Sequence, residues 1–168
     1  EKRKKYYVLN KIKSEKKFIK LSALRHNIRI ARCFTFIGKH IPKNETYAIG
    51  NFFEKAKNKS DIELKSFNSK YVFRSYLDSK NLVYSLMKML LNKEKINYPV
   101  FNIGSEQEIS IYKLATMFKK IFNIKVKIPN KNLKKVDYYV PETKKYKKYF
   151  KSKMLINLPN YIKRNFNF

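Results

Sequence analysis

The chain has 168 residues, of which 40 are Lys or Arg and 12 are Asp or Glu, so its formal net charge is +28 at pH 7. A single Cys excludes a disulfide framework and a cysteine-rich zinc module. The sequence has no run of about 18 apolar residues, which excludes a membrane-spanning helix. A hydrophobic content of 43% excludes a disordered composition.

Lys supplies most of the positive charge, because only six of the 40 basic residues are Arg. Nucleic-acid-binding proteins tend to use Arg, whose planar guanidinium binds phosphates and base edges with two parallel hydrogen bonds. Here the Lys residues are spread along the chain among many Asn, Ile, Tyr and Phe residues, which A/T-rich codons encode. We therefore interpret the charge as codon bias on solvated surfaces. A basic, non-enzymatic nucleic-acid-binding domain, whose Tyr and Phe rings stack on bases, is the alternative.

Apolar residues recur with helical and strand spacing in alternation along the chain. In chain order, the sequence predicts a helix over Lys4–Arg25, a strand over Ile28–Phe34, a helix over Thr46–Lys57, strands over Ile62–Leu64 and Tyr71–Leu77 around a turn at Phe67–Lys70, a helix over Ser79–Asn92, a strand over Tyr98–Gly104, a helix over Ser110–Phe122, a strand over Ile124–Ile128, and short helices over Lys144–Phe150 and Leu158–Asn165. Ser79 and Ser110 are the predicted N-caps of their helices. The alternation favours an α/β fold, and we expect residues 1–168 to form a single unit.

Tyr7 and Lys11 lie four residues apart in the first predicted helix, so their side chains share one face. A cation beside a phenol favours the phenolate, which is a usable general base for an alcohol or sugar hydroxyl. With so many Lys and 13 Tyr, the same spacing arises readily by chance. An amphipathic helix with a Tyr at its boundary is the simpler interpretation of the pair taken alone.

Six segments place this pair in a longer context: YVLNKIKSE from Tyr7, IRIARCFTFIG from Ile28, AIGNFF from Ala48, FRSYLDSKNL from Phe73, VFNIGSEQEISIYKLA from Val100 and YYVPETKK from Tyr138. Their order resembles the C-terminal half of the extended short-chain dehydrogenase/reductases, the NAD-dependent sugar-nucleotide epimerases and dehydratases. The similarity runs from about Tyr7 to about Lys145. It implies the end of a Rossmann-type sheet together with a small α/β substrate-binding subdomain.

The resemblance implies roles for residues around the cofactor. Tyr7 matches the catalytic tyrosine, which moves the proton of the sugar hydroxyl being oxidised. We expect this hydroxyl to be the one at C4. Lys11 matches the lysine that holds the nicotinamide ribose and assists the tyrosine. Arg32, Cys33 and Phe34 match the end of the strand whose backbone passes the nicotinamide.

It also implies roles for residues around the substrate. Asn51 matches the asparagine that contacts the diphosphate of the nucleotide sugar. Arg74 matches the arginine that reaches the phosphate or ribose of the nucleotide, and a guanidinium suits such an oxyanion. Glu15 falls on an acidic position one turn after the lysine, where we expect a structural role.

The dinucleotide fingerprint of the family is not in this sequence. Only three glycines occur, Gly38, Gly50 and Gly104, and they form no Gly-x-x-Gly-x-x-Gly motif. We therefore expect NAD to be bound mainly by an N-terminal half that would precede Glu1. We also expect the chain to be a fragment of such an enzyme, inactive when isolated. A degenerate paralogue that kept the fold and lost NAD is a further alternative.

The remaining expectations concern metals, partners and location. His26 and His40 are too few for a metal site, so we expect none. The resemblance implies a nucleotide-sugar substrate, an isomerase or lyase in cell-surface polysaccharide biosynthesis, and a homodimer through the helix that carries Tyr7 and Lys11. The first residues lack the basic-then-apolar pattern of a signal peptide, so we expect a cytoplasmic protein with no membrane partner.

Overall fold

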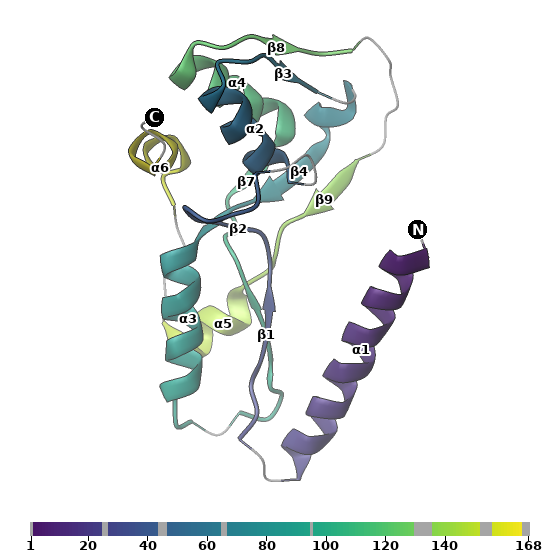
Figure 1. Cartoon of the computed structure of the whole chain (residues 1–168). Helices are drawn as coiled ribbons and strands as arrows, with labels where there is room; N and C mark the ends of the chain where they lie inside the picture. Colours follow the sequence, from purple (N-terminus) through teal and green to yellow (C-terminus); the bar gives the residue numbers. More distant parts are fainter. Residues whose placement is uncertain are drawn as a thin grey trace.

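The structure is a computed structural model of the chain, and it describes residues 2–24, 27–43, 47–64, 67–94, 96–129, 136–151 and 156–165. It has the mixed α/β architecture that the sequence predicts. Figure 1 shows two packed regions joined by strands that pass between them, with one long helix beside the lower region. No helix in the described parts of the chain is long and apolar enough to cross a membrane.

The lower region is built on two parallel strands, β1 (Ile30–Cys33) and β6 (Val100–Ile103). Two helices pack beside them, α3 (Ser79–Leu91) and α5 (Lys144–Phe150) (Figure 1). Apolar side chains of these elements and of β5 (Leu77–Asp78) form a common core: Leu77, Leu82, Met89, Phe101, Ile103, Tyr146 and Phe150. Their removal from water is the main force that holds α3 and α5 on the strands.

The long helix α1 (Lys2–Ala23) lies beside the lower region and is tied to it by an ion pair (Figure 1). Arg32 of β1 donates from Nε to Glu15 Oε2 at 2.8 Å and from Nη2 to Glu15 Oε1. This bidentate contact holds the pKa of the Glu15 carboxyl below its usual value. Eight apolar side chains of α1 and the residue after it are exposed nonetheless: Tyr6, Tyr7, Val8, Leu9, Ile12, Phe18, Leu21 and Leu24.

The upper region is built on two helices, α2 (Ala48–Lys57) and α4 (Ile111–Phe122). Phe53 of α2 meets Phe118 of α4 edge to face, with ring centroids 4.8 Å apart. The strands β3 (Ile62–Glu63) and β8 (Val126–Lys127) pair in parallel at one side. The C-terminal helix α6 (Leu158–Asn165) adds Leu158 and Ile162 to the same core.

A three-stranded sheet lies where the two regions meet. Its order is β7 (Glu108–Ser110), β4 (Val72–Ser75) and β9 (Asp137–Tyr139), and β4 is antiparallel to β7 and parallel to β9. A parallel pair, β2 (Phe36–Ile37) with β5 (Leu77–Asp78), continues from it toward α3. The pairing of β4 with β9 places Arg74 opposite Tyr139.

The predicted elements agree with the structure where local pattern is strong. The helices at 144–150 and 158–165 have the predicted bounds, and Ser110 caps α4 by accepting the N–H of Lys113 at 3.2 Å. The prediction of Ser79 as an N-cap is wrong, because the carboxylate of Asp78 accepts the N–H of Lys80 at 2.8 Å and α3 begins at Ser79.

Other bounds differ from the predicted ones. The first helix spans 2–23, and the second begins at Ala48, while predicted ends at Arg25 and Thr46 fall outside the described residues. The turn at 67–70 is a short 3-10 helix, η1 (Phe67–Lys70). The predicted strand at 71–77 is divided between β4 and β5, and strands β2, β7 and β9 were not predicted. These pieces have two to four residues, too few for a periodic signal.

Candidate functional site

The candidate site is a pocket of about 680 Å³ between the end of β1, the start of α2 and the sheet. Six aromatic side chains line it: Tyr7, Phe34, Phe36, Tyr47, Tyr76 and Tyr139. Arg74 is the only charged side chain among the described residues that line the pocket. A concave aromatic surface with one guanidinium suits a ligand that carries flat or apolar faces and an anionic group.

Tyr7 projects from α1 toward this pocket and lines it, although its side chain is 63% exposed. The Nζ of Lys11 lies 5.6 Å from the centroid of the Tyr7 ring, as the four-residue spacing predicts. Lys11 does not line the pocket itself. The structure thus brings the phenol and the ammonium together at the pocket edge, and their catalytic role stays a prediction.

Cys33 and Phe34 come from the C-terminal end of β1 and both line the pocket. Phe34 stacks on Tyr139 of β9, with ring centroids 4.8 Å apart and an interplanar angle of 28°. Burial raises the pKa of the Cys33 thiol, which favours the neutral thiol over a nucleophilic thiolate. Phe34 is therefore the better placed of the two to contact a ring of a ligand.

The position of Phe34 depends on a close backbone approach at Gly104, which follows β6. A Cβ at Gly104 would lie 2.9 Å from the Cβ of Phe34 and 2.7 Å from the Cγ of Pro141. Only glycine leaves room for both neighbours here. This glycine, in the segment that carried the most specific resemblance, packs the end of β1 against the chain that follows β9.

Arg74 reaches the pocket from β4, with 26% of its side chain exposed. Its Nη2 donates to Asp137 Oδ2 at 2.6 Å, and its Nη1 donates to the carbonyl oxygens of Phe73 at 2.8 Å and Asp137 at 3.4 Å. The Cζ of Arg74 lies 6.0 Å from the centroid of the Tyr139 ring. The guanidinium is thus held beside an aromatic side chain at the rim of the pocket.

Asn51 lies away from the pocket lining. It is half-buried on α2, and its backbone N–H donates to the carbonyl of Tyr47 at 2.9 Å. The residues of α2 and its N-cap that line the pocket are Tyr47, Ala48 and Ile49, one turn earlier. The predicted contact of Asn51 with a diphosphate therefore stays a prediction, while Tyr47 is a lining residue that the sequence analysis missed.

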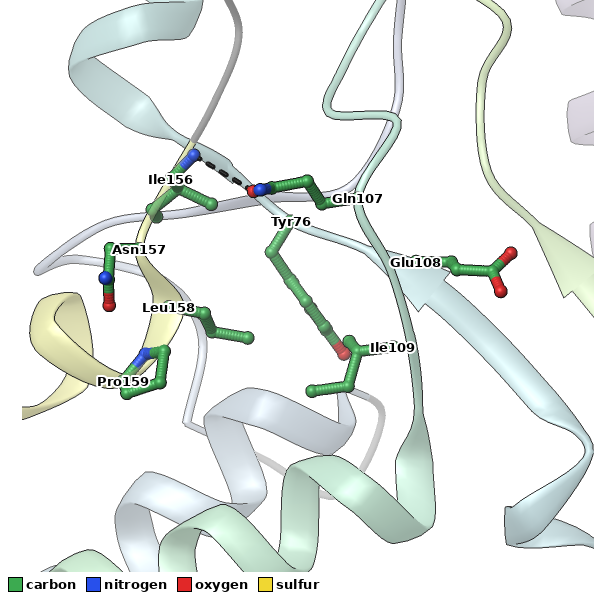
Figure 2. A pocket seen from close by; sticks show the side chains of 8 residues that line it. All are labelled: Tyr76, Gln107, Glu108, Ile109, Ile156, Asn157, Leu158 and Pro159. Carbon is green, nitrogen blue, oxygen red and sulfur yellow. Dashed lines mark hydrogen bonds between the residues drawn. The ribbon is translucent and has the colours of Figure 1, made fainter.

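A second, smaller pocket of about 310 Å³ lies behind the first, and Tyr76 lines both. Figure 2 shows the phenol of Tyr76 extending toward Ile109, with Gln107 accepting the backbone N–H of Ile156 at 3.2 Å. The Tyr76 side chain is only 3% exposed, and burial raises the pKa of its phenol above its usual value. Tyr76 therefore contributes an uncharged phenol to the lining of both pockets.

Among the described residues, no group of three or more His, Cys, Asp or Glu side chains could hold a metal ion. His40 is exposed in the loop after β2, and His26 lies outside the described residues.

No protein-family model and no curated protein matches the sequence. The structure is similar to RMD from Pseudomonas aeruginosa complexed with NADPH, with a TM-score of 0.75 and 16% identity over 95% of this chain and 53% of that one. It is also similar to the UDP-glucuronic acid 4-epimerase of Bacillus cereus in complex with UDP-glucuronic acid and NAD, with a TM-score of 0.68 and 16% identity over 85% and 45%. The UDP-glucose 4-epimerase of Thermotoga maritima with UDP-glucose gives a TM-score of 0.63 and 20% identity over 80% and 43%.

The fold is that of the C-terminal part of the extended short-chain dehydrogenase/reductases. This confirms the family resemblance at the level of the fold. The chain spans about half the length of each of these structures. In this structure, Tyr7 and the end of β1 line one pocket with Arg74.

Proposed function

We propose that the chain is the substrate-binding portion of an NAD-dependent sugar-nucleotide epimerase or dehydratase. The observation that carries the proposal is the convergence of Tyr7, Phe34 and Arg74 on one pocket, since these residues come from three separate elements. The similar structures hold UDP-glucose, UDP-glucuronic acid, NAD or NADPH, which supports this class of ligand for the same fold.

In the proposed complex, the cation and the aromatic rings of the pocket would contact different parts of the nucleotide sugar. Arg74 would pair with a diphosphate, because a planar guanidinium donates two hydrogen bonds to a pair of phosphate oxygens. Tyr47 and Tyr139 would cover the apolar faces of the sugar and exclude water from it. The net charge of +28 would add a long-range attraction for the anionic substrate.

Proton transfer would fall to Tyr7. As a phenolate, it takes the proton of the sugar hydroxyl, which we place at C4, while the C4 hydrogen leaves with its electron pair and a carbonyl forms. NAD, held at this end by Phe34 and Lys11, would supply the hydride acceptor. Lys11 places a positive charge 5.6 Å from the centroid of the Tyr7 ring, beside the phenol that would exchange the proton.

The residues of this chain fit one end of the cofactor. Phe34 offers an aromatic face and Lys11 an ammonium donor near Tyr7, which suit a nicotinamide and its ribose hydroxyls. The chain has no glycine-rich strand-to-helix turn to receive a pyrophosphate. We therefore expect the chain to be catalytically silent when it is produced alone.

The test is a Tyr7→Phe variant of the complete protein as its gene encodes it. With NAD and either UDP-glucose or UDP-glucuronic acid, we expect turnover to fall at least about 100-fold while binding of the nucleotide sugar is unchanged. Tyr6→Phe is the matched control, because Tyr6 is the neighbouring phenol, is 66% exposed and does not line the pocket. Equal turnover of Tyr7→Phe and Tyr6→Phe would contradict the assignment.

A homodimer through α1 belongs to the same proposal. Several apolar side chains of α1 face solvent at once, including Phe18 at 49% and Leu21 at 40% exposure, and such a surface favours a protein partner. Sedimentation velocity on the complete protein tests this point. A dimer that dissociates in a Phe18→Glu variant would support it, and a concentration-independent monomer of the unaltered protein would contradict it.

A further inference from the structure

Asp137 defines which edge of the Arg74 guanidinium is available to a ligand. Arg has five N–H donors, and its two terminal nitrogens form one edge while Nε and one terminal nitrogen form another. The bonds to Asp137 and to the carbonyl of Phe73 involve only Nη1 and Nη2. None of the described residues accepts a hydrogen bond from Nε of Arg74.

Backbone pairing places Asp137 beside Arg74. Asp137 pairs with Val72 in the β4–β9 register, and its N–H donates to the carbonyl of Tyr71 at 3.0 Å. The same register puts Tyr139 opposite Arg74. The main-chain pairing thus holds β9 against β4 independently of the Arg74–Asp137 ion pair.

The ion pair is too exposed to serve mainly as a source of stability. The side chain of Asp137 is 53% exposed and that of Arg74 is 26% exposed. Exposed ion pairs contribute little to folding, since water screens them and two side chains lose freedom. A short contact of 2.6 Å between these groups therefore points to orientation of the arginine.

We propose that Asp137 is a positioning residue for Arg74, which turns the Nε edge of the guanidinium toward the pocket for a two-point contact with the diphosphate of a nucleotide. The inference rests on the proposed function. Tyr139 supports the guanidinium from its aromatic face, 6.0 Å away, and is itself stacked on Phe34. Contacts from Arg74 to Tyr139 and from Tyr139 to Phe34 thus connect the proposed diphosphate site with the end of β1.

The direction in which nucleotide affinity changes when Asp137 is removed distinguishes a positioning role from simple charge repulsion. Asp137 is an anion close to where a second anion would bind, so electrostatics alone predicts that its removal tightens nucleotide binding. If Asp137 positions Arg74, its removal weakens binding, because the guanidinium loses its fixed orientation. The two effects have opposite directions, and no knowledge of the sugar is needed to tell them apart.

The experiment is isothermal titration of the complete protein with UDP, GDP and dTDP, using the diphosphate that binds best. We expect Arg74→Ala and Asp137→Ala each to weaken nucleotide binding about tenfold. Arg74→Lys keeps the charge but should still bind more weakly than the unaltered protein, because Lys lacks the planar guanidinium. Combined with Arg74→Ala, Asp137→Ala should cause no further loss. Glu142→Gln is the control, since it removes a carboxylate that is 71% exposed and pairs with Lys144.

Each outcome decides a different point. If none of the three nucleotides binds the unaltered protein, or if Arg74→Ala has no effect, the proposed function is overturned and this inference with it. If Arg74→Ala weakens binding while Asp137→Ala leaves it equal or tighter, only the positioning role is overturned. A further loss from Asp137→Ala in the Arg74→Ala background would show a general structural role instead.

Discussion

Replacing Glu106 by Gln tests a clamp that fixes the start of α5. The carboxylate of Glu106, in the loop after β6, accepts hydrogen bonds from the N–H and the hydroxyl of Thr143, both at 2.7 Å, and forms an ion pair with Lys147. The bond from Lys147 is the largest cause that lowers the pKa of Glu106, and with the Thr143 bonds it brings that pKa to about 2.

The direction and the magnitude of the Glu106 contribution to stability follow from its lowered pKa. Because the folded protein lowers the pKa of Glu106, the ionised carboxylate stabilises the fold above the ordinary pKa of 4.5, and this stabilisation is lost as the pH falls from about 4.5 to about 2. The full shift corresponds to roughly 3 kcal/mol. The side chains of Lys147 and Glu106 are 41% and 37% exposed, so screening reduces the expected contribution to about 1 kcal/mol.

Urea unfolding at several pH values measures this contribution. The free energy of unfolding of Glu106→Gln should lie about 1 kcal/mol below that of the unaltered protein at pH 7, and the gap should narrow as the pH falls below about 4.5. Glu142→Gln, which removes an exposed carboxylate, should show almost no gap at any pH. A gap for Glu106→Gln that does not change with pH would refute the electrostatic origin of the clamp.

Three further substitutions, one of them with a control variant, test the packing and capping that shape the site. Gly104→Ala places a Cβ 2.9 Å from the Cβ of Phe34, and should lower the free energy of unfolding by about 1–3 kcal/mol and also weaken nucleotide binding. Phe118→Ala empties the centre of the upper core, where this ring is fully buried, and should cost about 3–5 kcal/mol. Asp78→Ala removes the N-cap of α3 and should cost about 1 kcal/mol, while Ser79→Ala should cost less than about 0.5 kcal/mol. Urea denaturation measures the free energy of unfolding of each variant. A larger decrease for Ser79→Ala than for Asp78→Ala would contradict the assignment of Asp78 as the N-cap.

Local pattern in the sequence was sufficient for much of the fold. The predicted N-cap Ser110 and the helix that follows it, like the short helix at 144–150, are confirmed because capping and helical spacing act within a few residues. The contact between Tyr7 and Lys11 could be predicted for the same reason, because the two residues lie one turn apart in α1. The order of six segments was enough to indicate the family fold, which the similar structures confirm.

The tertiary structure decided how these parts form a pocket. Strand β9 has three exposed residues and no periodic signal, and it exists as a strand only because β4 pairs with it. That pairing brings Asp137 to Arg74 and Tyr139 onto Phe34, contacts between residues far apart in the sequence. Likewise, the packing of α2 against α4 turns Tyr47, and not Asn51, toward the pocket. Periodicity and capping report on neighbours along the chain, whereas strand pairing and helix packing choose partners across it, and the site is made by the second kind of contact.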